Sequence, residues 1–367
     1  MTAKIIFLGG FLGAGKTTMM CKLAELMRDR GIKAAFVTND QAPELVDTIF
    51  IKELSEAVGE ISGSCFCCNF NGFTEAAKRL VEKHQPEFIF AEPVGSCTDL
   101  SATIMQPLKE LYGKEMALAP LTVLCDAARV KALLENAPAG MHPNAAYIVE
   151  RQLEEADIIL ISKADTVEPA ELAALKNGAA ARWPHARIMA ASSTCACTPY
   201  GCGVKEWFDY AASAKEAGLR IAEVDYDRYA EGEAALGWLN ARVMLNGDGG
   251  WDDFASRLMT SLAEYFDARS CAVGHIKLIL KGAGGCVAAN LTGKSETLSV
   301  RGEAGSGGFA EMIFNARVET TPQKLEEAVR EKLAQACGEK ITAEIVELRS
   351  LQPGRPNPTH RYKEAVR

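Results

Sequence analysis

The chain has 367 residues, of which 48% are hydrophobic and 24% charged, with 40 Lys and Arg against 48 Asp and Glu. This length corresponds to about two domains, and the composition is that of a folded chain, which excludes a disordered polymer. The net charge of −8 argues against a general nucleic-acid binder, because such a protein needs a basic surface. We therefore expect no nucleic-acid partner.

The chain contains no run of about 18 apolar residues, so we expect no transmembrane helix and no membrane partner. The apolar stretch that follows the N-terminus, residues 5–8, is too short for a signal peptide. These two features predict a cytoplasmic protein. Twelve cysteines in such a chain then indicate packed thiols or metal ligands rather than a disulfide framework.

Short apolar runs alternate with helical stretches in the first part of the chain. The apolar runs lack polar alternation, as is typical of strands that are covered on both faces. This order predicts a doubly wound, mostly parallel α/β sheet domain over residues 1–220. The predicted strands are 4–8, 34–38, 88–91, 121–125 and 158–162, and the predicted helices are 17–30, 73–83 and 145–156.

The pattern changes after a charged segment, residues 221–232, which we expect to be a linker. The order strand, helix, four strands, helix, strand then predicts a smaller α+β domain of the split βαβ kind over residues 233–350. The tail, residues 351–367, contains three prolines and is expected to be extended and poorly packed. The predicted strands of the second domain are 241–245, 273–280, 286–291, 296–300, 310–318 and 341–348, and its predicted helices are 251–266 and 322–336.

Residues 10–17 fit the phosphate-loop pattern G-x-x-x-x-G-K-[ST], and they lie between the first predicted strand and the first predicted helix. The backbone of Gly13, Ala14 and Gly15 is expected to wrap the β-phosphate of a nucleotide, helped by the positive end of the helix. Lys16 is expected to bridge the β- and γ-phosphates, and Thr17 to place its hydroxyl on Mg²⁺. A chance glycine-rich turn is the alternative, which the strand–helix context disfavours.

Two acids follow predicted strands and are candidates for the Mg²⁺ and γ-phosphate site. Glu92 directly follows the strand 88–91, and Asp40 lies two residues after the strand 34–38. A carboxylate at the end of a strand beside the phosphate loop commonly holds Mg²⁺. We therefore predict catalytic roles for Lys16, Asp40 and Glu92, with solvated loop acids as the alternative for the two carboxylates.

The segment Ser162-Lys163-Ala164-Asp165 follows a predicted buried strand, where guanine-selective proteins carry N-K-x-D. Asp165 is expected to accept hydrogen bonds from the ring N–H and the exocyclic amine of guanine, and the Lys163 stem to cover the ring. Ser162 stands in place of Asn, is shorter, and can donate only one hydrogen bond. The segment still favours guanine over adenine, but it leaves the strictness of that selectivity open.

Cys65, Cys67 and Cys68 lie within four residues, between a strand and a helix. Thiolates suit Zn²⁺ or another soft to borderline divalent metal. Three thiolates leave a fourth position for water, for a carboxylate such as Glu44, or for a partner protein, which suits a carrier that releases its ion. Buried free thiols that act as small hydrophobic groups are the alternative.

Other cysteines and the histidines carry weaker signals. Cys195, Cys197 and Cys202 lie on one loop, where packing thiols are favoured over a second metal or redox site. His275 is expected at a solvated strand position. The remaining cysteines are isolated and are expected to be structural: Cys21, Cys97, Cys125, Cys271, Cys286 and Cys337.

With these motifs the chain resembles the CobW/UreG/HypB branch of phosphate-loop GTPases, and within it the CobW-like metallochaperones. The resemblance rests on G-G-x-x-G-A-G-K-T-T at 9–18, E-x-x-G at 92–95, C-x-C-C at 65–68 and the stretch 151–165. It covers residues 1–215 and implies that GTP or GDP binds with Mg²⁺, with Thr18 also in the nucleotide loop. The chain departs from the family at Ser162, at residues 41–44, and in lacking a histidine-rich tract in the second domain.

The resemblance and the cysteine motif predict a GTP-hydrolysing metallochaperone that delivers a zinc- or cobalt-like ion to a client metalloprotein. A GTPase that assists the loading or reactivation of a cobalt-corrinoid enzyme is an alternative within the same family. A regulatory nucleotide-binding module whose cysteines only pack is an alternative of another class. A small-molecule phosphotransferase is disfavoured because the sequence shows no arginine-bearing lid. A nucleotide- or metal-dependent homodimer is an open possibility.

Overall fold

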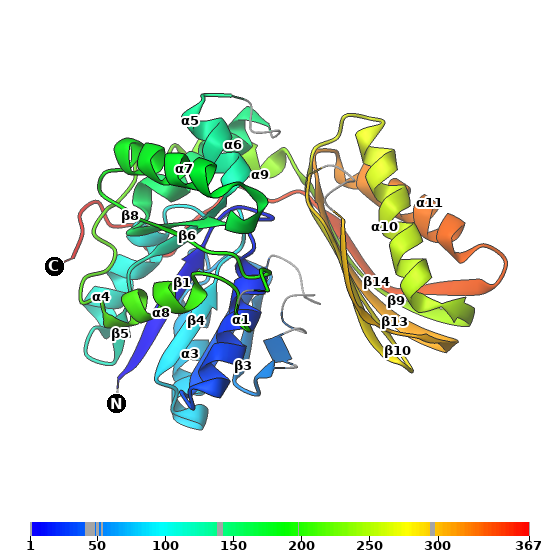
Figure 1. Ribbon diagram of the computed structural model, residues 1–367, viewed down its shortest axis with the longest axis horizontal. Helices are drawn as coiled ribbons and strands as arrows, with labels where there is room; N and C mark the ends of the chain where they lie inside the picture. The colour runs from blue at the N-terminus through cyan, green and yellow to red at the C-terminus, as the bar shows by residue number, and fades with distance from the viewer. Residues whose placement is uncertain are drawn as a thin grey trace.

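The structure is a computed structural model that describes residues 2–40, 48, 51–52, 54–137, 142–196, 198–293 and 298–366. Its described residues form two sheets, each with its own helices, and the two sheet domains lie side by side (Figure 1). None of the described helices has the length and apolar character needed to cross a bilayer.

The first sheet contains eight strands among the described residues, and all its pairs are parallel. Their order is β3-β2-β4-β1-β6-β7-β8, with β5 paired to β1. In β6 and β7 every residue is buried, which explains the continuous apolar runs in the sequence. The strands are β1 (Ala3–Gly9), β2 (Ala34–Asp40), β3 (Val58–Ser62), β4 (Phe88–Glu92), β5 (Met116–Leu118), β6 (Thr122–Asp126), β7 (Ile158–Ser162) and β8 (Arg187–Ala190).

Helices cover both faces of this sheet, which confirms the doubly wound architecture. Ile5 and Phe7 of β1 belong to a core shared with α3 and α6, whereas Ile6 and Leu8 belong to a core shared with α1 and α8. The helical elements of this domain are α1 (Lys16–Asp29), α3 (Phe70–His84), η1 (Ser101–Met105), α4 (Gln106–Tyr112), α5 (Ala127–Leu134), α6 (Pro143–Glu155), η2 (Ala164–Thr166), α7 (Pro169–Arg182) and α8 (Val204–Ser213).

The second sheet contains six antiparallel strands among the described residues, in the order β12-β11-β10-β13-β9-β14. Strand β13 lies between β9 and β10, which are joined through α10, so the predicted split βαβ arrangement is confirmed. Helices α10 and α11 cover one face, and the other face is turned toward the first domain (Figure 1). The elements are β9 (Gly237–Gly250), α10 (Trp251–Asp267), β10 (Val273–Gly282), β11 (Gly285–Leu291), β12 (Ser299–Glu303), β13 (Ser306–Val318), α11 (Pro322–Cys337) and β14 (Ile341–Leu351).

Two connecting segments differ from the prediction. The expected linker contains helix α9 (Tyr226–Ala234), which packs against α6 because its buried Tyr229 contributes to the first core. The tail is extended but runs back across the first domain (Figure 1), where Thr359 N–H donates to Cys67 O at 2.8 Å and Arg361 pairs with Asp99 at 2.7 Å. The expectation of a poorly packed tail is therefore wrong, whereas the domain boundaries stay predictions.

Candidate functional site: a phosphate loop beside a cysteine cluster

The phosphate loop connects β1 to α1 and depends on glycine backbone conformations. Gly10 has a φ of 130° and Gly15, which caps α1, has a φ of 92°, both in the region that favours glycine. A Cβ atom at Gly10 would also lie 2.3 Å from the carbonyl oxygen of Leu124. A side chain at Gly10 would therefore displace the backbone of the loop. Phosphate binding depends on this compact backbone, because its N–H groups contact the phosphate.

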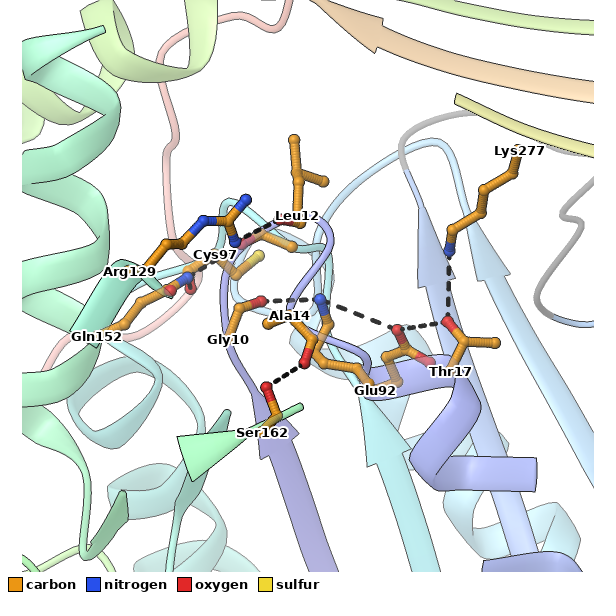
Figure 2. Close-up of polar contacts among 12 residues, drawn as sticks. Gly10, Leu12, Ala14, Thr17, Glu92, Cys97, Arg129, Gln152, Ser162 and Lys277 are labelled. Atoms are coloured by element: carbon orange, nitrogen blue, oxygen red, sulfur yellow. Dashed lines mark hydrogen bonds and ion pairs between the residues drawn. The ribbon is translucent and has the colours of Figure 1, made fainter. Parts of the chain in front are cut away.

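Thr17 and Glu92 meet at the carboxyl ends of β1 and β4 (Figure 2), and Lys16 lies beside Glu92. The Lys16 ammonium donates to Gly10 O at 2.7 Å and lies 3.9 Å from Glu92 Oε1. The Thr17 hydroxyl donates to the same carboxylate oxygen at 3.1 Å. A hydroxyl beside a carboxylate offers the oxygen ligands that Mg²⁺ prefers, so these residues fit the predicted ion. The side chain of Asp40 lies outside the described residues, and its role stays a prediction.

Two basic residues that the sequence analysis missed also reach the phosphate loop. Lys277, on β10 of the second domain, donates to the Thr17 hydroxyl at 3.4 Å. Arg129, on α5, donates to Leu12 O at 2.6 Å (Figure 2), and it pairs through Nε with Asp126 at 3.3 Å. No local motif marks either residue, because strand order and domain packing bring them to the loop.

His275 is buried, so the expectation of a solvated strand position is wrong. It lies two residues before Lys277 on β10, whose inward face meets the first domain. Burial lowers the pKa of His275 well below its usual range, and the positive charges of Lys277 and Arg317 lower it further. The neighbourhood of His275 is thus strongly cationic.

The segment predicted to bind the base follows β7. The Ser162 hydroxyl donates to Ala14 O at 2.7 Å, so this residue supports the phosphate loop (Figure 2). Lys163 adopts a left-handed conformation with a φ of 53°, and burial lowers its pKa. Asp165 is exposed on the turn η2, where its carboxylate is accessible to a base. The guanine preference stays a prediction that rests on Asp165.

The three thiols of the C-x-C-C motif lie together. The sulfur atoms of Cys65 and Cys67 are 2.8 Å apart, those of Cys67 and Cys68 are 3.8 Å apart, and all three lie within 4.8 Å of one another. A turn places them so, because the N–H of Cys68 donates to Cys65 O at 3.1 Å. Asn39 of β2 fixes the turn, since its side chain accepts from Phe66 N at 2.9 Å. The donor set fits Zn²⁺ or a similar ion.

Hydrogen bonds among these thiols shift their pKa values in opposite directions. Hydrogen bonds from Cys67 and Cys68 lower the pKa of Cys65, because they stabilise its thiolate. The hydrogen bond with Cys65 raises the pKa of Cys68 to about 11, and the same partner raises that of Cys67. Cys65 is therefore the first thiolate of the cluster to form. Glu44, a predicted further ligand, lies outside the described residues.

The structure also places several other cysteines. Cys97, which was expected to be structural, is buried in the core that contains Cys65 and Cys67. Cys195 and Cys202 form a disulfide, so the expectation of packing thiols is wrong for this pair. Cys197 lies outside the described residues.

The tail contacts the segment that carries the cysteine cluster. The N–H of Asn357 donates to the Cys68 sulfur at 3.3 Å, and the Thr359 hydroxyl donates to Cys68 O at 3.3 Å. The His360 ring contacts the Phe70 ring edge-on at a centroid distance of 4.9 Å. The end of the second domain thus returns to the predicted metal site.

Comparisons with known proteins identify the family of the nucleotide-binding domain. Residues 4–190, about half of the chain, match the family described as CobW/HypB/UreG, nucleotide-binding domain. The zinc chaperone YjiA of Escherichia coli strain K12 is 28% identical over 169 residues, which are 46% of this chain and 51% of that protein. The chain therefore matches about half the length of this curated relative.

Solved structures show lower identity. HypB from Helicobacter pylori in complex with nickel is 19% identical, and the match covers 57% of this chain and 85% of that one, with a TM-score of 0.39. The Zn(II)-bound YjiA GTPase from Escherichia coli is 16% identical over 92% of this chain and 99% of its own, with a TM-score of 0.34.

Proposed function

Because the chain belongs to the CobW/HypB/UreG family of nucleotide-binding proteins, we propose that it is a GTPase that carries a divalent metal ion on its C-x-C-C cluster. The ion is zinc- or cobalt-like, and its destination is a client metalloprotein. The observation that carries this proposal is the meeting of three thiols beside a complete phosphate loop in one domain.

The nucleotide-binding part of the proposal uses residues that lie together at the phosphate loop. Lys16 exchanges its contact with Gly10 O for the β- and γ-phosphates, and Ser162 holds the loop in place through Ala14. Thr17 and Glu92 hold Mg²⁺, which when bound supplies positive charge to the transferred phosphoryl group. Asp165 selects guanine through the acceptor pair of its carboxylate.

The metal-binding part of the proposal uses the three cysteines, whose turn is connected along the chain to the nucleotide site. Asn39, which fixes the cysteine turn, directly precedes Asp40 at the end of β2. The chain between Asp40 and the C-x-C-C turn therefore connects the predicted γ-phosphate site with the predicted metal site. Such a connection can act as a nucleotide-dependent switch, in which hydrolysis or client docking releases the ion.

Parallel assays of turnover and metal binding test the proposal. The reduced protein is expected to hydrolyse GTP in preference to ATP and to bind one Zn²⁺ in competition with a chelator. Lys16→Met should strongly lower turnover and keep the ion, and Cys67→Ser should lose the ion. Lys22→Met, on the same helix, and Cys337→Ser, a buried thiol in α11, are the matched controls. Turnover without any bound ion would support a regulatory nucleotide-binding module and refute the carrier.

A further inference from the structure

Strand β10 of the second domain carries a lysine to the phosphate loop of the first domain. The Lys277 ammonium donates to the Thr17 hydroxyl at 3.4 Å, and that hydroxyl donates to Glu92 Oε1 at 3.1 Å (Figure 2). Lys277 lies outside residues 4–190, the part of the chain that matches the nucleotide-binding family. A cationic group from the second domain therefore contacts the residue that is expected to hold Mg²⁺.

The register of β10 directs Lys277 toward the first domain. Its neighbours Ile276 and Leu278 belong to the core that is shared with α10 and α11, whereas Ile279 belongs to a separate small core. Because side chains alternate between the two faces of a strand, Lys277 shares its face with Ile279 and not with the core under the helices. This second face is turned toward the first domain (Figure 1).

The backbone around Lys277 is held on both sides and lies close to the phosphate loop. β10 is hydrogen-bonded to β11 on one side and to β13 on the other. A Cβ atom at Gly13 of the phosphate loop would lie 2.9 Å from Thr292 Cγ2 and 3.3 Å from Gly274 O, so the loop packs directly on the second domain. A side chain on such a rigid element is well positioned for a ligand of the loop.

We propose that Lys277 binds the γ-phosphate of GTP, so that the second domain distinguishes GTP from GDP. This inference rests on the proposed function, because it concerns the same nucleotide site. The Lys277 ammonium cannot keep its contact with the Thr17 hydroxyl when Thr17 holds Mg²⁺, since like charges repel each other. The γ-phosphate is the anion that phosphate-loop proteins hold against the same ion, and it offers the ammonium a new partner.

The chemistry of lysine suits this exchange of partners. Its ammonium is a compact charge with three donors on a flexible four-carbon stem, and lysine is a common phosphate ligand. Lys16 of the first domain already lies 3.9 Å from Glu92 Oε1, the oxygen that accepts from Thr17. The terminal phosphate thus receives positive charge from both domains. GDP lacks this phosphate, so hydrolysis removes the contact that the second domain makes.

Binding measurements with the two nucleotides test the inference. In Lys277→Met the affinity for a non-hydrolysable GTP analogue with Mg²⁺ should fall by about 10- to 150-fold, the effect of one charge-assisted hydrogen bond. The affinity for GDP with Mg²⁺ should be unchanged. Lys277→Arg should keep most of the affinity for the analogue, because a guanidinium also binds phosphate. Lys340→Met, an exposed lysine of the same domain, is the matched control and should equal the wild type.

The results separate a phosphate ligand from other roles of Lys277. An unchanged affinity for the GTP analogue in Lys277→Met, or an equal loss for GDP, would overturn the inference and leave the GTPase intact. Tighter binding of the analogue would show that the lysine only competes with Mg²⁺ for Thr17, which would also overturn it. A loss in Lys277→Arg as large as in Lys277→Met would refute the role of the charge. A wild type that binds neither nucleotide would refute the proposed function as well.

Chemical labelling of the wild type needs no variant. Lys277 is half-buried, so its amine is open to a small acylating reagent, and mass spectrometry measures the rate of its modification. The GTP analogue should slow the acylation of Lys277 relative to GDP, because an ammonium bound to phosphate is a poor nucleophile. The rate at Lys340 should be the same with both nucleotides. Equal rates at Lys277 with the analogue and with GDP would overturn the inference.

Discussion

Gly95 contacts the phosphate loop, and this contact predicts how much GTP affinity a Gly95→Ala substitution should cost. Gly95 does not have a positive φ, so alanine fits its backbone and the effect comes from the added methyl group alone. That methyl group would lie 2.6 Å from Leu12 Cδ2, and 3.2 Å from both Cγ and the backbone N of Leu12. Leu12 is buried, with 4% exposed, so its side chain has little room to move aside.

Overpacking of this kind costs about 1–3 kcal/mol. We expect Gly95→Ala to be accommodated by displacement of the phosphate loop, which nucleotide binding must reverse. The affinity for GTP should then fall by about 5- to 150-fold, the equivalent of that cost. Titration with a fluorescent GTP analogue measures the loss, and thermal unfolding shows how far the change also affects the fold.

Two further variants identify the cause. Gly250→Ala is the control, because the nearest atom to its added Cβ would be Asp253 Oδ2 at 3.7 Å, an ordinary contact. Leu12→Ala in the Gly95→Ala background removes the clashing side chain and should recover at least half of the lost binding free energy. Gly95→Ala with wild-type GTP affinity would refute the argument that this contact positions the phosphate loop.

The remaining predictions concern the nucleotide, the base, the metal and a buried acid. Lys16→Met should lower kcat for GTP by about 10²- to 10⁴-fold, since two charge-assisted phosphate contacts are lost, whereas turnover close to wild type would contradict the assigned role. Asp165→Asn should reduce the preference for GTP over ATP by at least about tenfold in competition binding, and an unchanged ratio would place base selection elsewhere. The affinity for Zn²⁺ should be about 5- to 150-fold higher with Mg²⁺–GTP bound than with GDP bound, and Zn²⁺ should raise the affinity for GTP by the same factor. Equal Zn²⁺ affinities in the two nucleotide states would mean that the thiolate site is not coupled to the nucleotide. Burial raises the pKa of Glu155 to about 8 from 4.5, so the native state binds this proton more tightly and loses stability as pH rises between these values. Between pH 5 and pH 8 the free energy of unfolding, measured with urea, should fall by an amount on the order of 4 kcal/mol in the wild type but not in Glu155→Gln. An equal fall in both proteins would contradict the assignment of this pH dependence to Glu155.

Contiguous residues determined much of the nucleotide site. The phosphate loop was predictable because its glycines, Lys16 and Thr17 act within one turn between a strand and a helix, so neighbouring residues specify the chemistry. The acid Glu92 followed from its place at the end of a buried strand, and the structure sets it 3.1 Å from the Thr17 hydroxyl. The second domain was predictable from the order of its strands and helices, which the split βαβ sheet reproduces.

Tertiary structure alone decided which distant residues joined these motifs. Cys97 is distant from Cys65 in the sequence, and the two share a buried core because β3 and β4 end at one edge of the sheet with β2 between them. His275 and Lys277 alternate like residues of any half-exposed strand, and the packing of the second sheet against the first domain buries one and brings the other to Thr17. A local pattern fixes the backbone conformation of a segment, but contacts between segments depend on strand order and domain packing, to which residues far apart in the chain contribute together.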